Sequence, residues 1–489
     1  MDKEKILRKN IIFSVIQMIA SVVLLFGFYR YLTKILTLSE FGVWSTLVAI
    51  VSLSKISDIG LTAGISRFVA IELARGSRSQ VSILLNTIIV FSLLIILTLA
   101  AIVFPFLDAL LSLIFEDQFL KIANALIPYV FINLLLTVAS SSYLSALDGA
   151  QKTDIRAKLA LLGLIVWVII SVILIPIYGL LGLAMAQIFQ SLLLLLVSRY
   201  IFYKKVINIS YLNFTYHFPL LKDLVGYSVN LQIISICSFL FEPMVKLLLT
   251  KFSGPAAAGL YEIGNQVVQR VRSIILSGNQ VIVPFMVNQV ELGEDKFDNF
   301  FIDNFKIIFF LSLFLCANLV TSSQTFSILM FDEVNVEFVM LIQLLALATF
   351  FNMLSAPSYF VNWVDAQIIK NTISHIATIV IVITTGWYFG ELFGIEGIYY
   401  SIFFAILLPS IYIIYDFLRK KNIPISDVLG SRAYLTSVLV CLPCLTYIIL
   451  IPYSLIMELL ILPTVYTAIF FLNRDFRSYF SKHVINNRV

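Results

Sequence analysis

The chain has 489 residues, of which 60% are hydrophobic and 12% are charged, and its formal net charge is +5. A water-soluble domain has about 45–50% apolar and ~25% charged residues, so this composition excludes a soluble protein and indicates one integral membrane unit. The modest net charge gives no indication of nucleic-acid binding, so no nucleic-acid partner is expected.

Long apolar runs follow one another from one end of the chain to the other. Each is predicted to be a membrane-spanning helix, because a crossing needs ~20 apolar residues and a lipid-exposed backbone must satisfy its own hydrogen bonds. The first run is longer than the apolar core of a signal peptide and is predicted to be an uncleaved span. The fourteen predicted spans are residues 11–32, 41–61, 81–106, 122–147, 158–177, 180–202, 224–250, 259–290, 304–322, 336–360, 371–390, 394–416, 433–451 and 455–472.

Basic residues alternate between the predicted loops. If the N-terminus lies in the cytoplasm, 25 of the 33 lysines and arginines fall in inside segments, and only Lys34, Lys121 and Lys251 fall outside. Cytoplasmic loops of membrane proteins carry an excess of Lys and Arg. The pattern therefore supports an even number of spans, with both termini in the cytoplasm.

The two halves of the chain repeat each other at a nearly constant offset in residue number. Such a duplication is common in transporters. The offset is 217 for Leu32, Thr33, Lys34 and Gly42 with Leu249, Thr250, Lys251 and Gly259, 216 for Tyr143, Ala150 and Gln151 with Tyr359, Ala366 and Gln367, and 215 for Gly179 and Gly182 with Gly394 and Gly397. Because the copies are displaced by an even number of spans, they should be related by an axis along the membrane normal. The sequence predicts an all-α fold with two six-helix lobes, residues 1–205 and 206–421, and a C-terminal helix pair with a cytoplasmic tail over 422–489.

Apart from charges near span ends that are counted with the loops, few charged residues remain inside the predicted spans, and these fall in the first two spans of each lobe. A charge there costs at least ~2.5 kcal/mol on insertion scales, so such residues are functional candidates. The basic ones are Arg30, Lys55, Lys246, Arg270 and Arg272, and the acidic ones are Asp58, Glu242 and Glu262. Arginine offers a bidentate fork to phosphate oxygens, so the basic set is predicted to bind an anionic headgroup. The acids are predicted to be charge partners of the basic residues or sites for a coupling cation, H⁺ or Na⁺.

Amide side chains in the same spans are candidate contacts for a neutral sugar chain. They are Gln17, Asn230, Gln232, Asn265, Gln266, Gln269, Asn279 and Gln280.

Purely structural roles are the alternative for the charged residues and for the amides. Amide side chains also form interhelical hydrogen bonds. Lys55 with Asp58, and Glu242 with Lys246, have the spacing of intrahelical ion pairs. Arg30 and Lys246 lie near enough to span ends to reach the interface.

Three short segments carry a family resemblance: residues 38–44 (LSEFGVW), 58–61 (DIGL) and 176–182 (PIYGLLG). They resemble the recurring segments of Wzx-type polysaccharide or O-antigen flippases, which belong to the multidrug/oligosaccharidyl-lipid/polysaccharide exporter (MOP) superfamily. The resemblance implies that the chain moves undecaprenyl-pyrophosphate-linked oligosaccharides from the cytoplasmic to the periplasmic leaflet by alternating access. It also implies a bacterial inner membrane, a central cavity lined by the first two helices of each lobe, and other membrane proteins of polysaccharide assembly as partners.

Two other transport functions stay open at this point. One is a lipid II-type flippase for peptidoglycan precursors, and the other is a multidrug or metabolite antiporter of the same superfamily. Drug exporters of this kind typically place a protonatable acid in the opening helix of the first lobe, and the first predicted span has none.

No enzymatic activity, cofactor or metal site is expected. The histidines are scattered, and no H-E-x-x-H, G-x-S-x-G or P-loop pattern occurs in the sequence. Cys441 and Cys444 lie in an apolar run and are predicted to be packed thiols.

Overall fold

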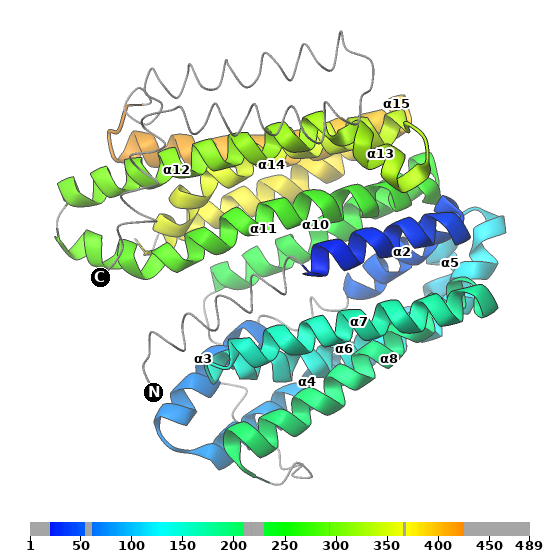
Figure 1. Ribbon diagram of the computed structural model, residues 1–489, viewed down its shortest axis with the longest axis horizontal. Coiled ribbons are helices and arrows are strands. Elements are labelled where there is room, and N and C mark those ends of the chain that lie inside the picture. Colours follow the sequence, from blue (N-terminus) through cyan, green and yellow to red (C-terminus); the bar gives the residue numbers. More distant parts are fainter. Residues whose placement is uncertain are drawn as a thin grey trace. The chain divides into compact units, whose positions relative to one another are not determined.

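The computed structural model describes residues 20–53, 61–209, 217, 229–292, 294–364 and 368–424 (Figure 1). Within these ranges every regular element is helical, and eight helices are long and apolar enough to cross a membrane. The predicted all-α membrane fold is thereby confirmed. The predicted spans 433–451 and 455–472 lie outside the described residues. By packing, the chain divides into two compact units, residues 1–259 and 260–489.

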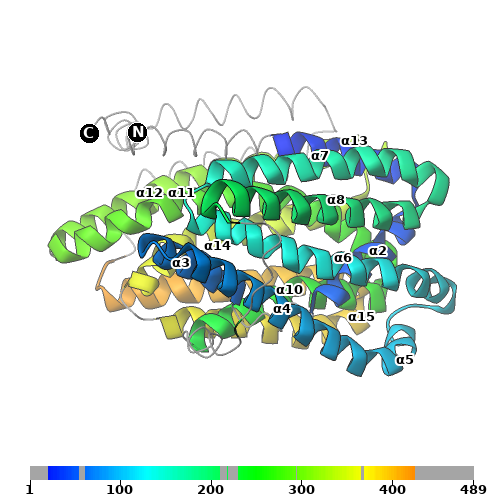
Figure 2. The same ribbon diagram turned by 90° about the horizontal axis from the view of Figure 1, so that it is seen from below.

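The first unit follows the predicted spans closely. A helix over residues 20–35 precedes its labelled elements. These are α2 (Leu38–Ser52), α3 (Leu61–Ala74), α4 (Arg78–Val103), a 3₁₀ turn η2 (Phe104–Phe106), α5 (Leu107–Ser112), α6 (Asp117–Gly149), α7 (Thr153–Tyr178), α8 (Leu180–Ile201), a π-helical turn η3 (Phe202–Ile207) and α10 (Val229–Ser253). Helix α8 packs along both α6 and α7, and the three lie side by side in Figures 1 and 2.

The second unit begins within α11 (Pro255–Leu292) and continues through α12 (Glu294–Thr321), α13 (Ser323–Phe331), α14 (Val336–Val364) and α15 (Ile368–Lys420). Gly394 breaks α15 into two halves, which correspond to the predicted spans 371–390 and 394–416. An ion pair of 2.7 Å between Lys370 and Asp416 joins the start of the first half to the end of the second. The two halves therefore fold back on each other as a hairpin.

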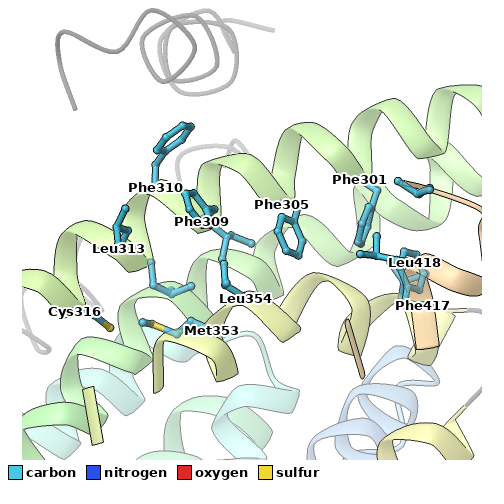
Figure 3. Close-up of a cluster of buried hydrophobic side chains, with 14 of the residues drawn as sticks. Phe301, Phe305, Phe309, Phe310, Leu313, Cys316, Met353, Leu354, Phe417 and Leu418 are labelled. Carbon is cyan, nitrogen blue, oxygen red and sulfur yellow. The ribbon is translucent and has the colours of Figure 1, made fainter. Parts of the chain in front are cut away.

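The core of the second unit is aromatic. Phe305 and Phe309 of α12 point toward Met353 and Leu354 of α14 (Figure 3). Phe301, further along the same side of α12, lies against Phe417 and Leu418 at the end of α15, and the ring centroids of Phe301 and Phe417 are 4.4 Å apart. Burial of such side chains contributes roughly 1.5–3 kcal/mol each in water. Inside a membrane, van der Waals packing replaces this driving force.

The predicted duplication reappears as repeated backbone geometry. Gly179 has φ 56° and ψ −132°, and its counterpart Gly394 has φ 57° and ψ −131°. Both values lie in a region that favours glycine. Further along, a Cβ on Gly182 would collide with the carbonyl of Leu174, and one on Gly397 would collide with that of Phe389. Leu174 and Phe389 have the same offset in residue number as the two glycines, so both copies make the same interhelical turn.

A second pair of repeated glycines lies where α2 meets the start of α11, within the first unit. A Cβ on Gly42 would collide with the carbonyl of Pro255, and a Cβ on Gly259 would lie 2.8 Å from the carbonyl oxygen of Leu38. Leu38 and Pro255 have the same offset in residue number as Gly42 and Gly259, so the contact is reciprocal. Glycine is needed at both positions because the two backbones touch.

Helix α10 packs on α2 near this crossing, where the hydroxyls of Thr46 and Thr250 lie 2.8 Å apart. This packing places α10 in the first compact unit, although the sequence assigns it to the second lobe. The lobe boundaries at 205/206 and 421/422 stay a prediction.

Candidate substrate-binding site

The second unit contains a hydrogen-bonded polar network centred on Arg272 of α11. Its Nε donates to Oδ1 of Asn352 on α14 at 2.7 Å, and its Nη1 donates to Oε1 of Gln269 at 3.1 Å. Asn352 Nδ2 in turn donates to the Ser410 hydroxyl on α15 at 3.2 Å, and Gln269 Nε2 donates to Oδ1 of Asn265 at 3.3 Å. We call these five residues the Arg272 network.

Helical spacing explains how α11 contributes to this network. Asn265, Gln269 and Arg272 follow one another at steps of four and three positions, which places them on one face of the helix. Ser410 donates its own proton to the Ile406 carbonyl at 2.7 Å, so it can only accept from Asn352. The Asn352 carboxamide is thereby oriented with its oxygen toward the guanidinium. The network holds Arg272 in one position.

One edge of the guanidinium is left free by these contacts. In the described part of the chain, neither Nη2 nor the second Nη1 hydrogen of Arg272 donates to any protein group. The Arg272 side chain is half-buried, so the described residues do not enclose it completely. A guanidinium that is fixed on one edge and free on the other suits an oxyanion that approaches the free edge.

A tyrosine and a histidine that we did not expect from the sequence lie near this network. The Tyr359 hydroxyl and His375 Nε2 are 3.2 Å apart, and both residues interact electrostatically with Arg272. Tyr359 is the repeat counterpart of Tyr143, whose hydroxyl accepts from Arg199 at 2.5 Å in the first unit. Each unit thus has a basic side chain close to the repeated tyrosine.

The other predicted residues of α11 lie apart from the free edge of Arg272. Arg270 is two positions away, ~200° around the helix, so the two arginines are on different sides of α11. Its half-buried guanidinium has no hydrogen-bond or ion-pair partner among the described residues. Glu262 is buried and accepts from Gln266 Nε2 at 3.0 Å. The structure therefore does not bring Arg270 and Arg272 together at one point.

In the first unit, Lys246 of α10 is 4% exposed and forms an ion pair of 2.6 Å with Glu242, one turn earlier. Arg30 is half-buried on the helix over residues 20–35. Three other predicted site residues lie outside the described residues: Gln17, Lys55 and Asp58. Four more lie in described helices, but the positions of their side chains are not described: Asn230, Gln232, Asn279 and Gln280. Within the described ranges, no group of three His, Cys, Asp or Glu side chains is arranged to hold a metal ion.

The fold matches that of MOP-superfamily transporters. An inward closed structure of the lipid II flippase MurJ is similar to 97% of this chain and 100% of its own, with a TM-score of 0.73 and 15% identity. An inward-facing multidrug resistance MATE family transporter covers 85% of this chain and 99% of its own, with a TM-score of 0.68 and 15% identity. A MOP superfamily transporter from Pyrococcus furiosus covers 84% of this chain and 95% of its own, with a TM-score of 0.57 and 14% identity.

Residues 7–289, more than half of the chain, match the family described as polysaccharide biosynthesis protein. The chain belongs to this family, and the resemblance recognised in its sequence is confirmed at that level. No curated protein sequence matches the chain.

Proposed function

We propose that this protein is a flippase for lipid-linked oligosaccharides. It moves undecaprenyl-pyrophosphate-linked repeat units of O-antigen or capsule from the cytoplasmic to the periplasmic leaflet by alternating access. The observation that carries the proposal is a fixed arginine with a free edge, on a helix that the sequence predicts to span the membrane, in a member of the polysaccharide biosynthesis family.

The chemistry of such a substrate matches the Arg272 network. A pyrophosphate leaves water only if its charge is compensated and its oxygens are hydrogen-bonded. The free edge of Arg272 supplies both, and Asn352 and Gln269 hold that edge in place before the substrate arrives. Arg270, Lys55, Lys246 and Arg30 would add positive charge elsewhere along the path of the headgroup.

The driving force for transport is a second part of the proposal. Asp58, Glu242 and Glu262 are the acids predicted inside the spans, and one of them would bind the coupling cation, H⁺ or Na⁺.

The inner membrane of a bacterium, with both termini in the cytoplasm, is the location that fits the distribution of basic loops. Other membrane proteins of polysaccharide assembly would supply and consume the lipid-linked unit.

The structural likeness favours one alternative substrate. The MurJ structure covers essentially the whole of both chains, so a lipid II-type flippase is the second candidate function. A multidrug or metabolite antiporter has the support of the MATE fold. The family match to polysaccharide biosynthesis ranks the lipid-linked oligosaccharide first.

Deletion of the gene in its source organism tests this ranking. We expect loss of a surface polysaccharide, accumulation of its lipid-linked repeat unit and continued viability when synthesis of that unit is also blocked. Glycan staining of the cell surface and analysis of extracted lipids are the measurements. A lethal phenotype with accumulated lipid II would contradict the proposal and favour the second candidate function.

A further inference from the structure

A polar cavity of about 320 Å³ lies inside the first unit, between α2, α6 and α8. Among the described residues that line it, none is charged. Its polar lining is made of carboxamides and hydroxyls, chiefly Asn133, Thr137, Ser141, Gln187, Gln190 and Ser191. We call this the amide cavity. Its volume lies at the lower end of the ~300–1,000 Å³ range of small-molecule sites.

Part of the lining is hydrogen-bonded between α6 and α8. Ser191 Oγ donates to Asn133 Oδ1 at 2.6 Å and lies 3.2 Å from the Thr137 hydroxyl. Asn133 Nδ2 donates to Gln187 Oε1 at 3.4 Å, which is a long contact. These bonds fix the wall of the amide cavity.

Two carboxamides keep unused hydrogen-bonding capacity. In the described residues, the Gln187 amide nitrogen donates to no protein group, and the Gln190 side chain forms no hydrogen bond at all. Both glutamines are half-buried on α8 and line the cavity. Interhelical bonding accounts for Asn133, Thr137, Ser191 and the Gln187 oxygen. It does not account for the Gln187 nitrogen or for the Gln190 carboxamide.

The duplication shows that the fold itself does not require this polarity. At the offset that relates Gly182 to Gly397, the residues Gln187, Gln190 and Ser191 correspond to Ile402, Ala405 and Ile406 on α15. The equivalent positions in the second unit are thus apolar, although both copies share the same interhelical turn. An apolar side chain fits this place in the repeat, and the first unit has polar side chains there instead.

We propose that the amide cavity binds the neutral carbohydrate part of the transported lipid. This inference rests on the proposed function and assigns one of its contacts. A carboxamide both donates and accepts, as a sugar hydroxyl does, so Gln187 and Gln190 can each pair with hydroxyls of a glycan. The described lining residues are all uncharged, which favours a neutral occupant over a phosphate or a drug cation.

The two units then carry different parts of the recognition. The second unit holds a fixed guanidinium for the anionic pyrophosphate, whereas the first holds uncharged amides for the glycan. The sugar candidates predicted from the sequence lie on the first two spans of each lobe, and α6 and α8 lie outside that set. The sequence feature that indicates α8 as a binding helix is the presence of three polar residues, Gln187, Gln190 and Ser191, close together in a predicted span.

Binding of two lipids to the full-length protein in nanodiscs tests this inference. One probe is undecaprenyl pyrophosphate without sugar, and the other is the pool of undecaprenyl-pyrophosphate-linked oligosaccharide extracted from the source organism. The test variant is Gln187→Leu with Gln190→Leu, which keeps side-chain size and removes both free amides. The matched control is Gln343→Leu, because Gln343 is a half-buried amide of the second unit that bonds to Ser323.

We expect the double variant to lose about tenfold or more of its affinity for the sugar-bearing lipid and to keep its affinity for the sugar-free lipid. The control should retain both affinities. An equal loss for both lipids, or no loss for either, would overturn the carbohydrate site. If the unmodified protein binds neither lipid, the proposed function itself fails. If it binds both lipids equally well, only the carbohydrate site fails.

Discussion

Replacing Arg272 with glutamine is expected to reduce translocation of the lipid-linked glycan by about 30-fold or more while folded protein remains in the membrane. Truncating one partner of a buried charge pair typically costs ~2–5 kcal/mol, which corresponds to a factor of at least ~30. Glutamine can still bond to Asn352, so the packing between α11 and α14 should survive. The measurement is transport in proteoliposomes, normalised to the amount of folded protein.

Three further variants give this prediction its controls. Arg272→Lys keeps the charge but loses the fork, and should recover only a small part of the activity. Asn352→Leu removes the group that holds Nε, and should give an intermediate loss through a raised KM. Lys121→Gln removes an exposed charge at the start of α6 and should have no effect. Full activity of Arg272→Gln would contradict the phosphate role of this residue.

Replacing Gly42 with alanine is expected to be the most destabilising of the small substitutions in the chain. The added Cβ would collide with the backbone carbonyl of Pro255, which cannot move without shifting the start of α11. Overpacking usually costs ~1–3 kcal/mol, and the cost is higher where the obstacle is backbone. We expect a melting temperature lowered by several degrees and a reduced yield of folded protein.

Gly27→Ala is the matched control for this prediction. Gly27 lies within the helix over residues 20–35, and a Cβ there has no neighbour within 4 Å. Alanine should therefore be neutral or stabilising by up to ~1 kcal/mol, because it lowers the backbone entropy of the unfolded chain. Equal melting temperatures for Gly42→Ala and Gly27→Ala would show that α2 and α11 do not cross as closely as described.

The helical fold could be predicted because lipid imposes it. Every described span from 81–106 to 394–416 overlaps a helix, since a run of ~20 apolar residues has no other stable form in a membrane. The repeat was visible because its glycines are structural requirements: Gly179 and Gly394 share one backbone conformation. The packing of α10 on α2 could not be predicted, because hydropathy carries no information about which helices are neighbours.

The candidate site was predictable only where it is charged. Arg272 stands out in an apolar run, but Asn352 and Ser410 are neutral side chains on other helices, far along the chain. Nothing in their own segments shows which side of the helix they occupy. The predicted basic set includes both Arg270 and Arg272, but a two-position step on a helix separates their side chains by ~200° and places them on different sides of α11.

Movement of a lipid-linked oligosaccharide between leaflets by this protein can be measured through the accessibility of the glycan in each leaflet. Purified protein is reconstituted into liposomes with labelled undecaprenyl-pyrophosphate-linked oligosaccharide or with labelled lipid II, and the glycan exposed outside is cleaved by an added glycosidase over time. We expect rapid exposure of the oligosaccharide lipid, dependent on Arg272, and no acceleration for lipid II. Exposure of the oligosaccharide lipid at the rate of protein-free liposomes, or acceleration of lipid II alone, would contradict the proposed function.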